Sequence, residues 1–401
     1  MKIVALETIL SKDFPNLLWV QIHTDEGLVG LGETFYWPQA VAAYLHEAVE
    51  PYLLGRDPLS IEQHSRVLLQ GFLASGNAGV ETRGHSAIDI ALWDIFGQAA
   101  GLPVWQLLGG RSRDRVRIYN TCTGYEYLHE PVSFASTGWT RRQGDARAPF
   151  EDLQDTTKRP GELAQELLES GITAMKIWPF DPFGAAYQGM YLSAADIDRG
   201  LEPFRRIRQA VGSRMDVMLE FGGLWNLPTA MRIARAVEPF EPFWFEDPFR
   251  MDNLDALAEF ARATRVPVAA SEMLGTRFAF RELLERRAVG IVMLDLGWIG
   301  GLSEARKVAA MAEAYKLPVA PHDCTGPVVW TTSLHLSVSL PNVVIQEAVR
   351  SYYSGWYREV LTTVPTVESG FASPPNGSGL GTKLHPDFLR RPTTQIRRGA
   401  L

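Results

Sequence analysis

Three glutamates recur at equal spacing in the middle of this chain. Glu220, Glu246 and Glu272 stand 26 residues apart, and each ends a short, mostly apolar run: MDVML, PFWF and PVAAS. Helical patterns such as NLPTAMRIARAVE and LDALAEFARATR lie between these runs. A repeat of this length fits one strand–loop–helix–loop unit, so the sequence predicts the same strand end in three neighbouring units. The three carboxylates are then expected on one rim.

Carboxylates held close together raise one another's pKa unless a cation neutralises them. A single glutamate at a strand end is more often a surface residue or an ion-pair partner, but three in register indicate a metal site. Oxygen ligands without cysteine or histidine favour a hard ion. We therefore predict one Mg²⁺ per subunit, bound by Glu220, Glu246 and Glu272.

Alternation of strand and helix patterns continues on both sides of these units. It predicts eight strands that end near Thr121, Lys176, Glu220, Glu246, Ser271, Leu294, Pro321 and Glu347. Eight such units match the ~250-residue scale of a parallel α/β barrel. A doubly wound open sheet is the alternative, but no glycine-rich phosphate-binding turn follows the first strand. We therefore predict an α/β fold with a (β/α)7β barrel.

The first part of the chain reads differently, as strands followed by helices. In the segment SAIDIALWDIFGQAAG we expect a helix with Ser86 as N-cap that stops at Gly101 and Pro103. These patterns predict an α+β capping domain over 1–115, the barrel over 116–350, and a C-terminal segment over 351–401 that returns to the capping domain and completes it.

Composition excludes several classes of protein. A net charge of −7 without a long basic run argues against a nucleic-acid partner. No run approaches the ~18 apolar residues that a membrane span requires. Cys122 and Cys324 are the only cysteines, too few for a disulfide framework. We expect a cytoplasmic protein with no membrane partner.

Reactive side chains end the other predicted strands as well. Asp295 would fix the tautomer of His322 and leave its second nitrogen as a base, and Lys176 in ITAMKIW would stabilise oxyanion charge. Glu347 alone also fits a bridge between two strands. Together with the metal, these residues suit removal of a proton from the carbon next to a carboxylate. A small-molecule carboxylate is the expected substrate.

The chain resembles the enolase superfamily, mandelate racemase subgroup, which the segments AMKIW, LEFGG, FEDP, ASEML, VAPHD and GFASPPNGSGLG carry. The resemblance implies Mg²⁺ on the three glutamates, a His322–Asp295 base dyad, and Lys176 as the first lysine of a Lys-x-Lys motif. It implies that Glu347 hydrogen-bonds the substrate carboxylate. It also implies a cap that closes over the barrel through loops at 13–16 and 34–38, and a homo-oligomer.

Three positions depart from the family pattern. Trp178 replaces the second lysine of the motif, Glu220 replaces the usual aspartate, and Gly222 stands where relatives carry asparagine or a histidine that serves as an acid. Racemisation needs two bases, whereas in a dehydration His322 can remove the proton and then return it to the leaving hydroxide. The missing lysine therefore favours a sugar-acid dehydratase, acting on an aldonate or aldarate to give a 2-keto-3-deoxy acid.

Two other functions stay open on sequence grounds. An isomerase, whether an epimerase, racemase or lactone cycloisomerase, uses the same first step, and a non-catalytic descendant would only bind acid sugars. A zinc hydrolase lacks support because the first barrel strand, VRIYNTC, has no His-x-His pair. We expect substrate contacts from Trp178 and Trp37. Trp139, Arg141 and Arg142 are further candidates in the long loops 124–160 and 179–196.

Overall fold

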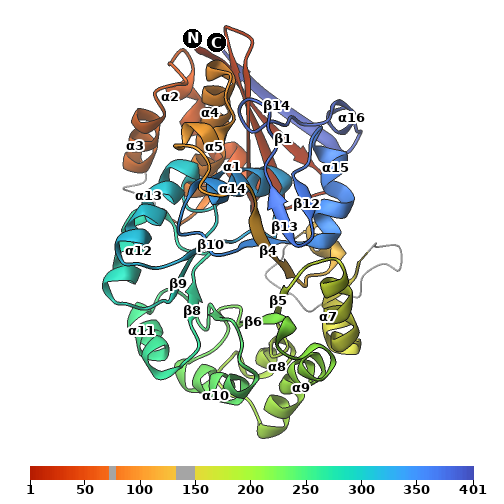
Figure 1. Cartoon of the computed structure of the whole chain (residues 1–401). Helices are drawn as coiled ribbons and strands as arrows, with labels where there is room; N and C mark the ends of the chain where they lie inside the picture. The colour runs from red at the N-terminus through yellow and green to blue at the C-terminus, as the bar shows by residue number, and fades with distance from the viewer. Residues whose placement is uncertain (72–77, 132–149) are drawn as a thin grey trace.

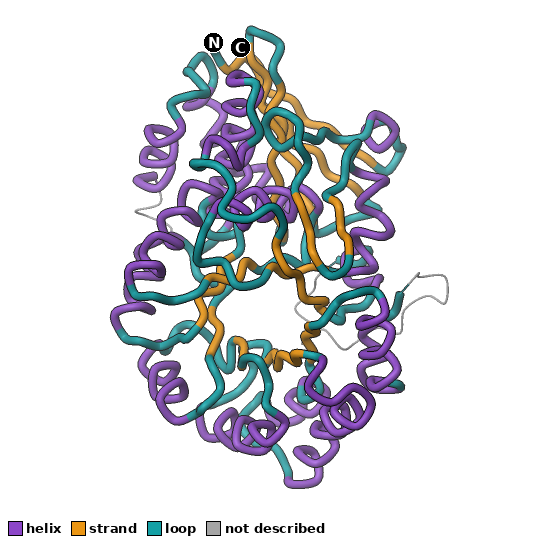
Figure 2. Tube along the Cα trace, viewed as in Figure 1, coloured by secondary structure: helices purple, strands orange, loops and turns teal. Residues whose placement is uncertain are grey.

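Eight parallel strands form a barrel in the part of the chain that the computed structural model describes, residues 1–71, 78–131 and 150–401. Neighbouring strands pair in chain order, β11 pairs with β4, and a bridge between Val319 and Val343 joins the last gap. Figure 2 shows this ring of strands. The strands are β4 (Val116–Thr121), β5 (Ala174–Ile177), β6 (Asp216–Glu220), β7 (Phe245–Glu246), β8 (Val268–Ala270), β9 (Ile291–Leu294), β10 (Val319–Pro321) and β11 (Gln346–Ala348).

Helices surround the ring and connect successive strands (Figure 1). They are α7 (Pro160–Glu169), α9 (Ala194–Val211), α10 (Leu227–Val237), α11 (Leu254–Ala263), α12 (Thr276–Glu285), α13 (Gly301–Ala314) and α14 (Pro327–Ser339), with the short α6 (Asp152–Lys158) and α8 (Asp181–Gly184) in the two longest connections. Helix α10 illustrates the pattern. Asn226 caps it by accepting from the Thr229 N–H, and its buried residues recur at helical spacing toward the strands.

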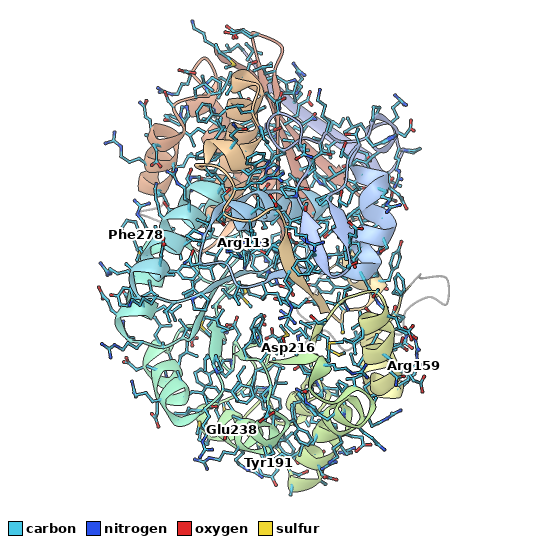
Figure 3. All side chains as sticks on the ribbon, viewed as in Figure 1. Arg113, Arg159, Tyr191, Asp216, Glu238 and Phe278 are labelled. Atoms are coloured by element: carbon cyan, nitrogen blue, oxygen red, sulfur yellow. The ribbon has the colours of Figure 1, made fainter. Side chains whose placement is uncertain are left out.

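The predicted barrel is confirmed, and each strand ends within one residue of its expected end. Side chains from six of the strands, with Trp244 and Ile345 directly before β7 and β11, meet in one buried cluster inside the ring, which Figure 3 shows filled with side chains. A cluster that draws on every position around the ring can only lie in the barrel interior. Its members are Tyr119, Ala174, Met218, Trp244, Ala269, Ile291, Met293, Ala320 and Ile345.

A four-stranded antiparallel sheet forms the capping domain, in the order β14 (Thr394–Ala400), β1 (Ile3–Ser11), β2 (Leu17–Thr24) and β3 (Val29–Phe35). The last strand of the chain thus pairs with the first, which confirms that the C-terminal segment completes the cap. Helices α1 (Pro38–Tyr44), α2 (Glu50–Leu53), α3 (Ile61–Gly71), α4 (Val80–Ala100) and α5 (Val104–Leu107) accompany the sheet. No described helix is both long enough and apolar enough to cross a membrane.

Helix α4 lies almost in contact with the backbone of β3. A Cβ at Gly30 or Gly32 would stand 2.1 Å or 1.9 Å from the carbonyl oxygens of Ala91 and Ala87, so only glycine permits this approach. The predicted end of the helix at Gly101 is confirmed, with Gly101 in the left-handed conformation. Its predicted start at Ser86 was wrong. The helix begins at Val80, and the Ser86 hydroxyl donates to the Thr82 carbonyl and accepts from the Gly300 N–H.

The segment after the barrel contacts both domains. Strands β12 (Thr366–Glu368) and β13 (Phe371–Ser373) form a hairpin, and β13 pairs antiparallel with β4 of the barrel. The short helices α15 (Tyr357–Val360) and α16 (Pro386–Leu389) then lead to β14 in the cap. The domain boundaries at 115/116 and 350/351 stay a prediction.

Buried hydrogen bonds join the cap to the barrel. The Thr34 hydroxyl donates to the Gly297 carbonyl (2.7 Å), and the Trp93 indole donates to the Ser303 hydroxyl (2.9 Å). Glu33, at the end of β3, accepts from the Val328 and Val329 N–H groups (3.0 and 2.8 Å) in the first turn of α14. N–H groups in the first turn of a helix have no partner within that helix, so a residue of the capping domain provides the hydrogen-bond acceptor for the first turn of a barrel helix.

Glu33→Ala should therefore destabilise the protein, because it removes the acceptor for two buried N–H groups. The expected loss is about 1–3 kcal/mol, seen as a lower midpoint of thermal unfolding. Glu33→Gln is the control, since its amide oxygen can still accept, and it should lose less than Glu33→Ala. Equal losses of stability in the two variants would contradict the prediction, because they would show that the acceptor oxygen does not account for the effect of Glu33.

Candidate active site

The candidate site is a polar layer that lies directly on the buried apolar cluster. Side chains two residues apart on a strand point to the same face, so each strand places its next inward side chain at the C-terminal end of the barrel. These side chains stand two positions after Tyr119, Ala174, Met218, Trp244, Ala269, Met293, Ala320 and Ile345. They are Thr121, Lys176, Glu220, Glu246, Ser271, Asp295, His322 and Glu347.

The three equally spaced glutamates meet in this layer. One carboxylate oxygen from each of Glu220, Glu246 and Glu272 lies within 4.8 Å of the other two. Glu220 and Glu246 are direct neighbours in the pairing of β6 with β7, while Glu272 comes from the turn just after β8. Backbone and ring donors orient two of them: the Gly222 N–H donates to Glu220 (2.6 Å) and the Trp244 indole to Glu246 (2.8 Å).

The electrostatics of this cluster fit a divalent cation. Burial, and next the carboxylate of Glu246, raise the pKa of Glu220 well above its ordinary value. Burial likewise raises the pKa of Glu272 to about 7. A cation among the oxygens would offset this repulsion and keep the carboxylates ionised, and an all-oxygen set of donors suits Mg²⁺. The residues present therefore fit the ion that the sequence predicts.

Lys176 reaches into the same group of acids from the end of β5. Its Nζ lies 2.5 Å from Glu246, 2.9 Å from Glu347 and 3.6 Å from Glu220. Burial would lower the pKa of Lys176, but the carboxylates of Glu246 and Glu347 raise it well above its ordinary value. The ammonium is therefore charged and can stabilise negative charge on a ligand oxygen.

His322 and Asp295 form the predicted pair. His322 Nδ1 lies 2.7 Å from Asp295 Oδ2, and the other Asp295 oxygen accepts from the Gly297 N–H (2.6 Å). The Asp295 carboxylate accepts from Nδ1–H, so in the neutral form of the imidazole the lone pair lies on Nε2. Nε2 points toward the metal cluster, 3.0 Å from Glu272.

The charge state of His322 depends on its acidic neighbours. Burial would lower its pKa, but the carboxylates of Glu272 and Glu347 raise it well above its ordinary value. Positive charge held by Glu272 would weaken that attraction. A bound cation would therefore favour the neutral imidazole that a general base requires.

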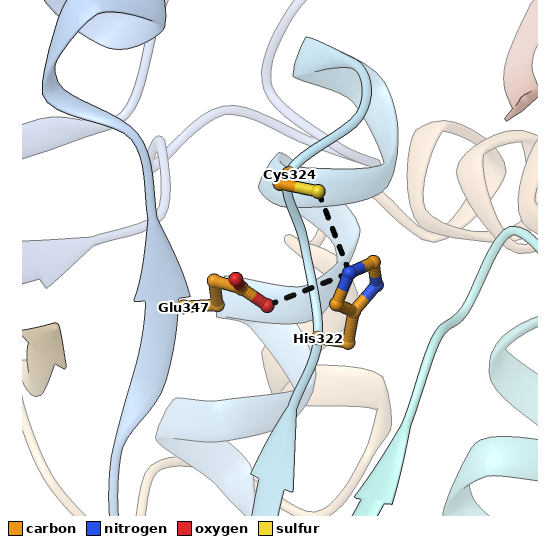
Figure 4. Close-up of side chains that lie close together, drawn as sticks. All are labelled: His322, Cys324 and Glu347. Atoms are coloured by element: carbon orange, nitrogen blue, oxygen red, sulfur yellow. Dashed lines mark hydrogen bonds and ion pairs between the residues drawn. The ribbon is translucent and has the colours of Figure 1, made fainter. Parts of the chain in front are cut away.

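Glu347 connects Lys176 with the region around His322. It accepts from the Thr121 hydroxyl and from the Asp323 N–H (2.9 Å), and it lies 3.7 Å from His322 Nε2 (Figure 4). Burial would raise the pKa of Glu347, but Lys176 and His322 lower it to about 2. The side chain is thus an ionised acceptor inside the polar layer.

A cavity of about 720 Å³ opens over this layer, a size that suits a small molecule. Lys176, Glu220, Glu272 and His322 line it, together with both predicted tryptophans. Trp178 is buried, with its ring centroid 5.8 Å from Lys176 Nζ, and Trp37 is 44% exposed at the cap. Trp139, Arg141 and Arg142 lie outside the described residues.

The cap adds Tyr36, from the loop at 34–38 that the resemblance implied, and Arg83, which sequence reasoning missed. Tyr36 and Arg83 line the cavity, and Tyr36 and Trp37 both have left-handed backbone (φ 72° and 53°), which is uncommon outside glycine. The Arg83 guanidinium lies 4.6 Å from the centroid of Trp298, and the described residues give it no carboxylate partner. A buried cation facing a cavity favours an anionic ligand. Its position inside α4 gave no signal beyond its charge.

A second missed residue stands beside Gly222. Asp181, the first residue of the short helix α8 after β5, is buried, and neither of its oxygens has a hydrogen-bond partner among the described residues. A Cβ at Gly222 would lie 3.5 Å from Asp181 Oδ2, and burial raises the pKa of Asp181 well above its ordinary value. A buried carboxyl with a raised pKa thus lies next to Gly222, one of the three positions that depart from the family pattern.

Comparison with known proteins identifies the class. Residues 160–388 match the family described as enolase C-terminal domain-like, and residues 5–109 match the N-terminal domain of the mandelate racemase and muconate lactonizing enzymes. The chain belongs to the enolase superfamily, in its mandelate racemase subgroup. The resemblance seen in the sequence is confirmed.

Individual relatives cover nearly the whole chain. A crystal structure of an enolase of the mandelate racemase subgroup from Agrobacterium tumefaciens is 48% identical, covers 100% of this chain and 99% of its own, and has a TM-score of 0.88. D-galactonate dehydratase from Ralstonia nicotianae is 31% identical, over 96% of this chain and 92% of its own. D-xylonate dehydratase from Haloferax volcanii is 30% identical, over 95% and 86%. This chain is thus an enzyme of a superfamily that includes hydro-lyases.

The metal assignment makes a testable prediction. Mg²⁺ should raise the midpoint of thermal unfolding of the wild type, with stabilisation of roughly 2.7 kcal/mol at a hundredfold excess over its dissociation constant. Glu246→Gln should abolish this shift, because it removes the buried central ligand. Asp252→Asn is the matched control: Asp252 also lines the cavity but is exposed and pairs with Arg250, so its shift should persist. Equal shifts in wild type and Glu246→Gln would reject the site.

Proposed function

We propose that this protein is a Mg²⁺-dependent dehydratase of an acid sugar, an aldonate or aldarate, that yields a 2-keto-3-deoxy acid. The observation that carries the proposal is the position of His322. Asp295 fixes the tautomer of its neutral form, and its Nε2 lies 3.0 Å from Glu272, one of the three clustered carboxylates. A base is thus placed beside the site of positive charge, where a substrate carboxylate would bind.

Glu220, Glu246 and Glu272 would hold the ion, which supplies positive charge to the substrate carboxylate and so acidifies the adjacent carbon. Lys176 donates to a carboxylate oxygen as negative charge develops there. Glu347 keeps Lys176 in place through its 2.9 Å contact and can accept from the substrate. Arg83 and Trp37 of the cap also line the cavity.

His322 performs both proton transfers in this proposal. Nε2 takes the proton from the carbon next to the carboxylate, and the resulting imidazolium then gives a proton to the departing β-hydroxyl, which leaves as water. The product is an enol that tautomerises to the 2-keto-3-deoxy acid. Atoms and charge balance, because the enzyme returns to its initial protonation state.

The cavity favours elimination over racemisation. Racemisation needs a second base on the opposite face of the substrate, and the second lysine of the motif is replaced by Trp178, a buried residue that lines the cavity. Among the described residues that line the cavity, Lys176 is the only lysine. The names of the relatives, D-galactonate and D-xylonate dehydratase, support the same reaction type.

A screen of mono- and diacid sugars tests the function, with detection of keto acid as the readout. D-galactonate and D-xylonate are the first candidates, and diacids extend the panel because Arg83 offers an anion site. The expected result is keto acid from at least one sugar acid, dependent on Mg²⁺. Conversion of a sugar acid into an isomer without keto acid would instead assign an epimerase or cycloisomerase.

The role of His322 makes a sharper prediction. In D₂O, exchange of the α-proton should occur for substrate of one α-configuration only, because one base acts from one face. His322→Asn should abolish both exchange and dehydration with the fold retained, and Asp295→Asn should be less severe because it misorients the imidazole without removing it.

Two results would contradict this assignment. Exchange at both α-configurations in the wild type would reveal a second base and favour an isomerase. Asp181→Asn is the informative comparison for the second proton transfer: exchange that survives while dehydration is lost would assign that step to Asp181 instead of His322.

A further inference from the structure

A second set of metal-ligating atoms lies beside the base dyad. His322 Nε2, Cys324 Sγ and a Glu347 carboxylate oxygen all lie within 4.8 Å of one another. The sulfur is 3.5 Å from Nε2, and Glu347 Oε2 is 3.7 Å from Nε2. Figure 4 shows the three side chains converging from the end of β10, the segment after it, and β11.

The separations match the edges of a tetrahedral zinc site. Zn–S and Zn–N bonds of about 2.3 and 2.0–2.1 Å, at a tetrahedral angle, place sulfur and nitrogen about 3.5 Å apart. The observed distance between Sγ and Nε2 is 3.5 Å. The pair thus already has the separation that sharing an ion requires, and a carboxylate oxygen of Glu347 lies within 4.8 Å of both atoms.

The groups behind these atoms are those that a zinc site requires. A metal-bound histidine usually donates its other N–H to a carboxylate, and His322 does so to Asp295 at 2.7 Å. Glu347 Oε2 is oriented by the Asp323 N–H. The Cys324 thiolate and the Glu347 carboxylate would supply negative charge to a divalent ion, and Glu347 would share its charge with Lys176, whose Nζ lies 2.9 Å from it.

The ion chemistry separates this set from the three glutamates. Thiolate and imidazole ligands favour Zn²⁺ and disfavour Mg²⁺, whereas the all-oxygen cluster suits Mg²⁺. His322 and Cys324 both line the cavity, so an ion can reach them and a water or substrate oxygen can take the fourth position.

We propose that His322, Cys324 and Glu347 form a Zn²⁺ site that switches the enzyme off. The Cys324 thiol releases its proton to solvent as the zinc–sulfur bond forms, and Nε2 gives its lone pair to the ion. The base can then no longer accept the substrate's proton. The inhibition, though not the binding, rests on the proposed role of His322 as the base.

Cobalt substitution tests binding without reference to activity. With Mg²⁺ in excess, Co²⁺ added to the wild type should produce a near-ultraviolet thiolate-to-cobalt charge-transfer band, which Zn²⁺ abolishes by competition. Cys324→Ser should lack the band. Cys122→Ser is the matched control, because Cys122 is equally buried but packs against Asn120 away from the cavity, and it should keep the band. A band that persists in Cys324→Ser, or is absent from the wild type, overturns the site.

Zinc inhibition tests the consequence. Once a substrate is known, the zinc concentration for half-inhibition under saturating Mg²⁺ should rise about tenfold or more in Cys324→Ser, and not in Cys122→Ser. Equal inhibition of all three proteins would mean that zinc acts by replacing Mg²⁺ on the glutamates, which overturns the switch.

A second experiment does not need the Cys324→Ser variant to fold. In Cys122→Ser, Cys324 is the single remaining thiol, and its rate of alkylation can be measured with and without zinc. Zn²⁺ should slow its alkylation, and an unchanged rate would reject the proposal.

Discussion

The buried contact between Lys176 and its carboxylates is the interaction on which the site depends. The ammonium lies 2.5 Å from Glu246 and 2.9 Å from Glu347, in a layer removed from solvent. An isolated charge at this depth would be costly, so ammonium, imidazole and acids are stable there only as a group. The layer holds more carboxylates than cations. A bound cation would offset this excess negative charge, which also raises the pKa of His322.

The barrel and the inner residues of the site were predictable because a strand has a side-chain period of two. The apolar runs located the strands, and the polar residue that ended each run had to face the same interior as the apolar residue two positions earlier. Glu220, Glu246, Asp295 and His322 follow directly from that rule. Equal spacing of the glutamates could then be interpreted as one cluster.

Other parts of the site depend on tertiary contacts that no local pattern reveals. Arg83 lies within a helix whose start was misplaced. Ser86 resembles an N-cap in the sequence, but its hydroxyl donates to the Thr82 carbonyl and accepts from the Gly300 N–H of the barrel. Asp181 lies next to Gly222 from the start of the short helix α8, in a connection with little periodicity. Cys324 could be considered a metal ligand only once the structure placed its sulfur 3.5 Å from His322 Nε2.

The pairing of β14 with β1 has a consequence for how the chain matures during synthesis. Barrel closure needs residues up to β11, which emerge from the ribosome well before the last strand of the cap sheet. Until then, the open edge of β1 is a template for strands of other chains. Arg397 and Arg398, on the strand that finally covers this edge, give the finished sheet a charged border that discourages such pairing.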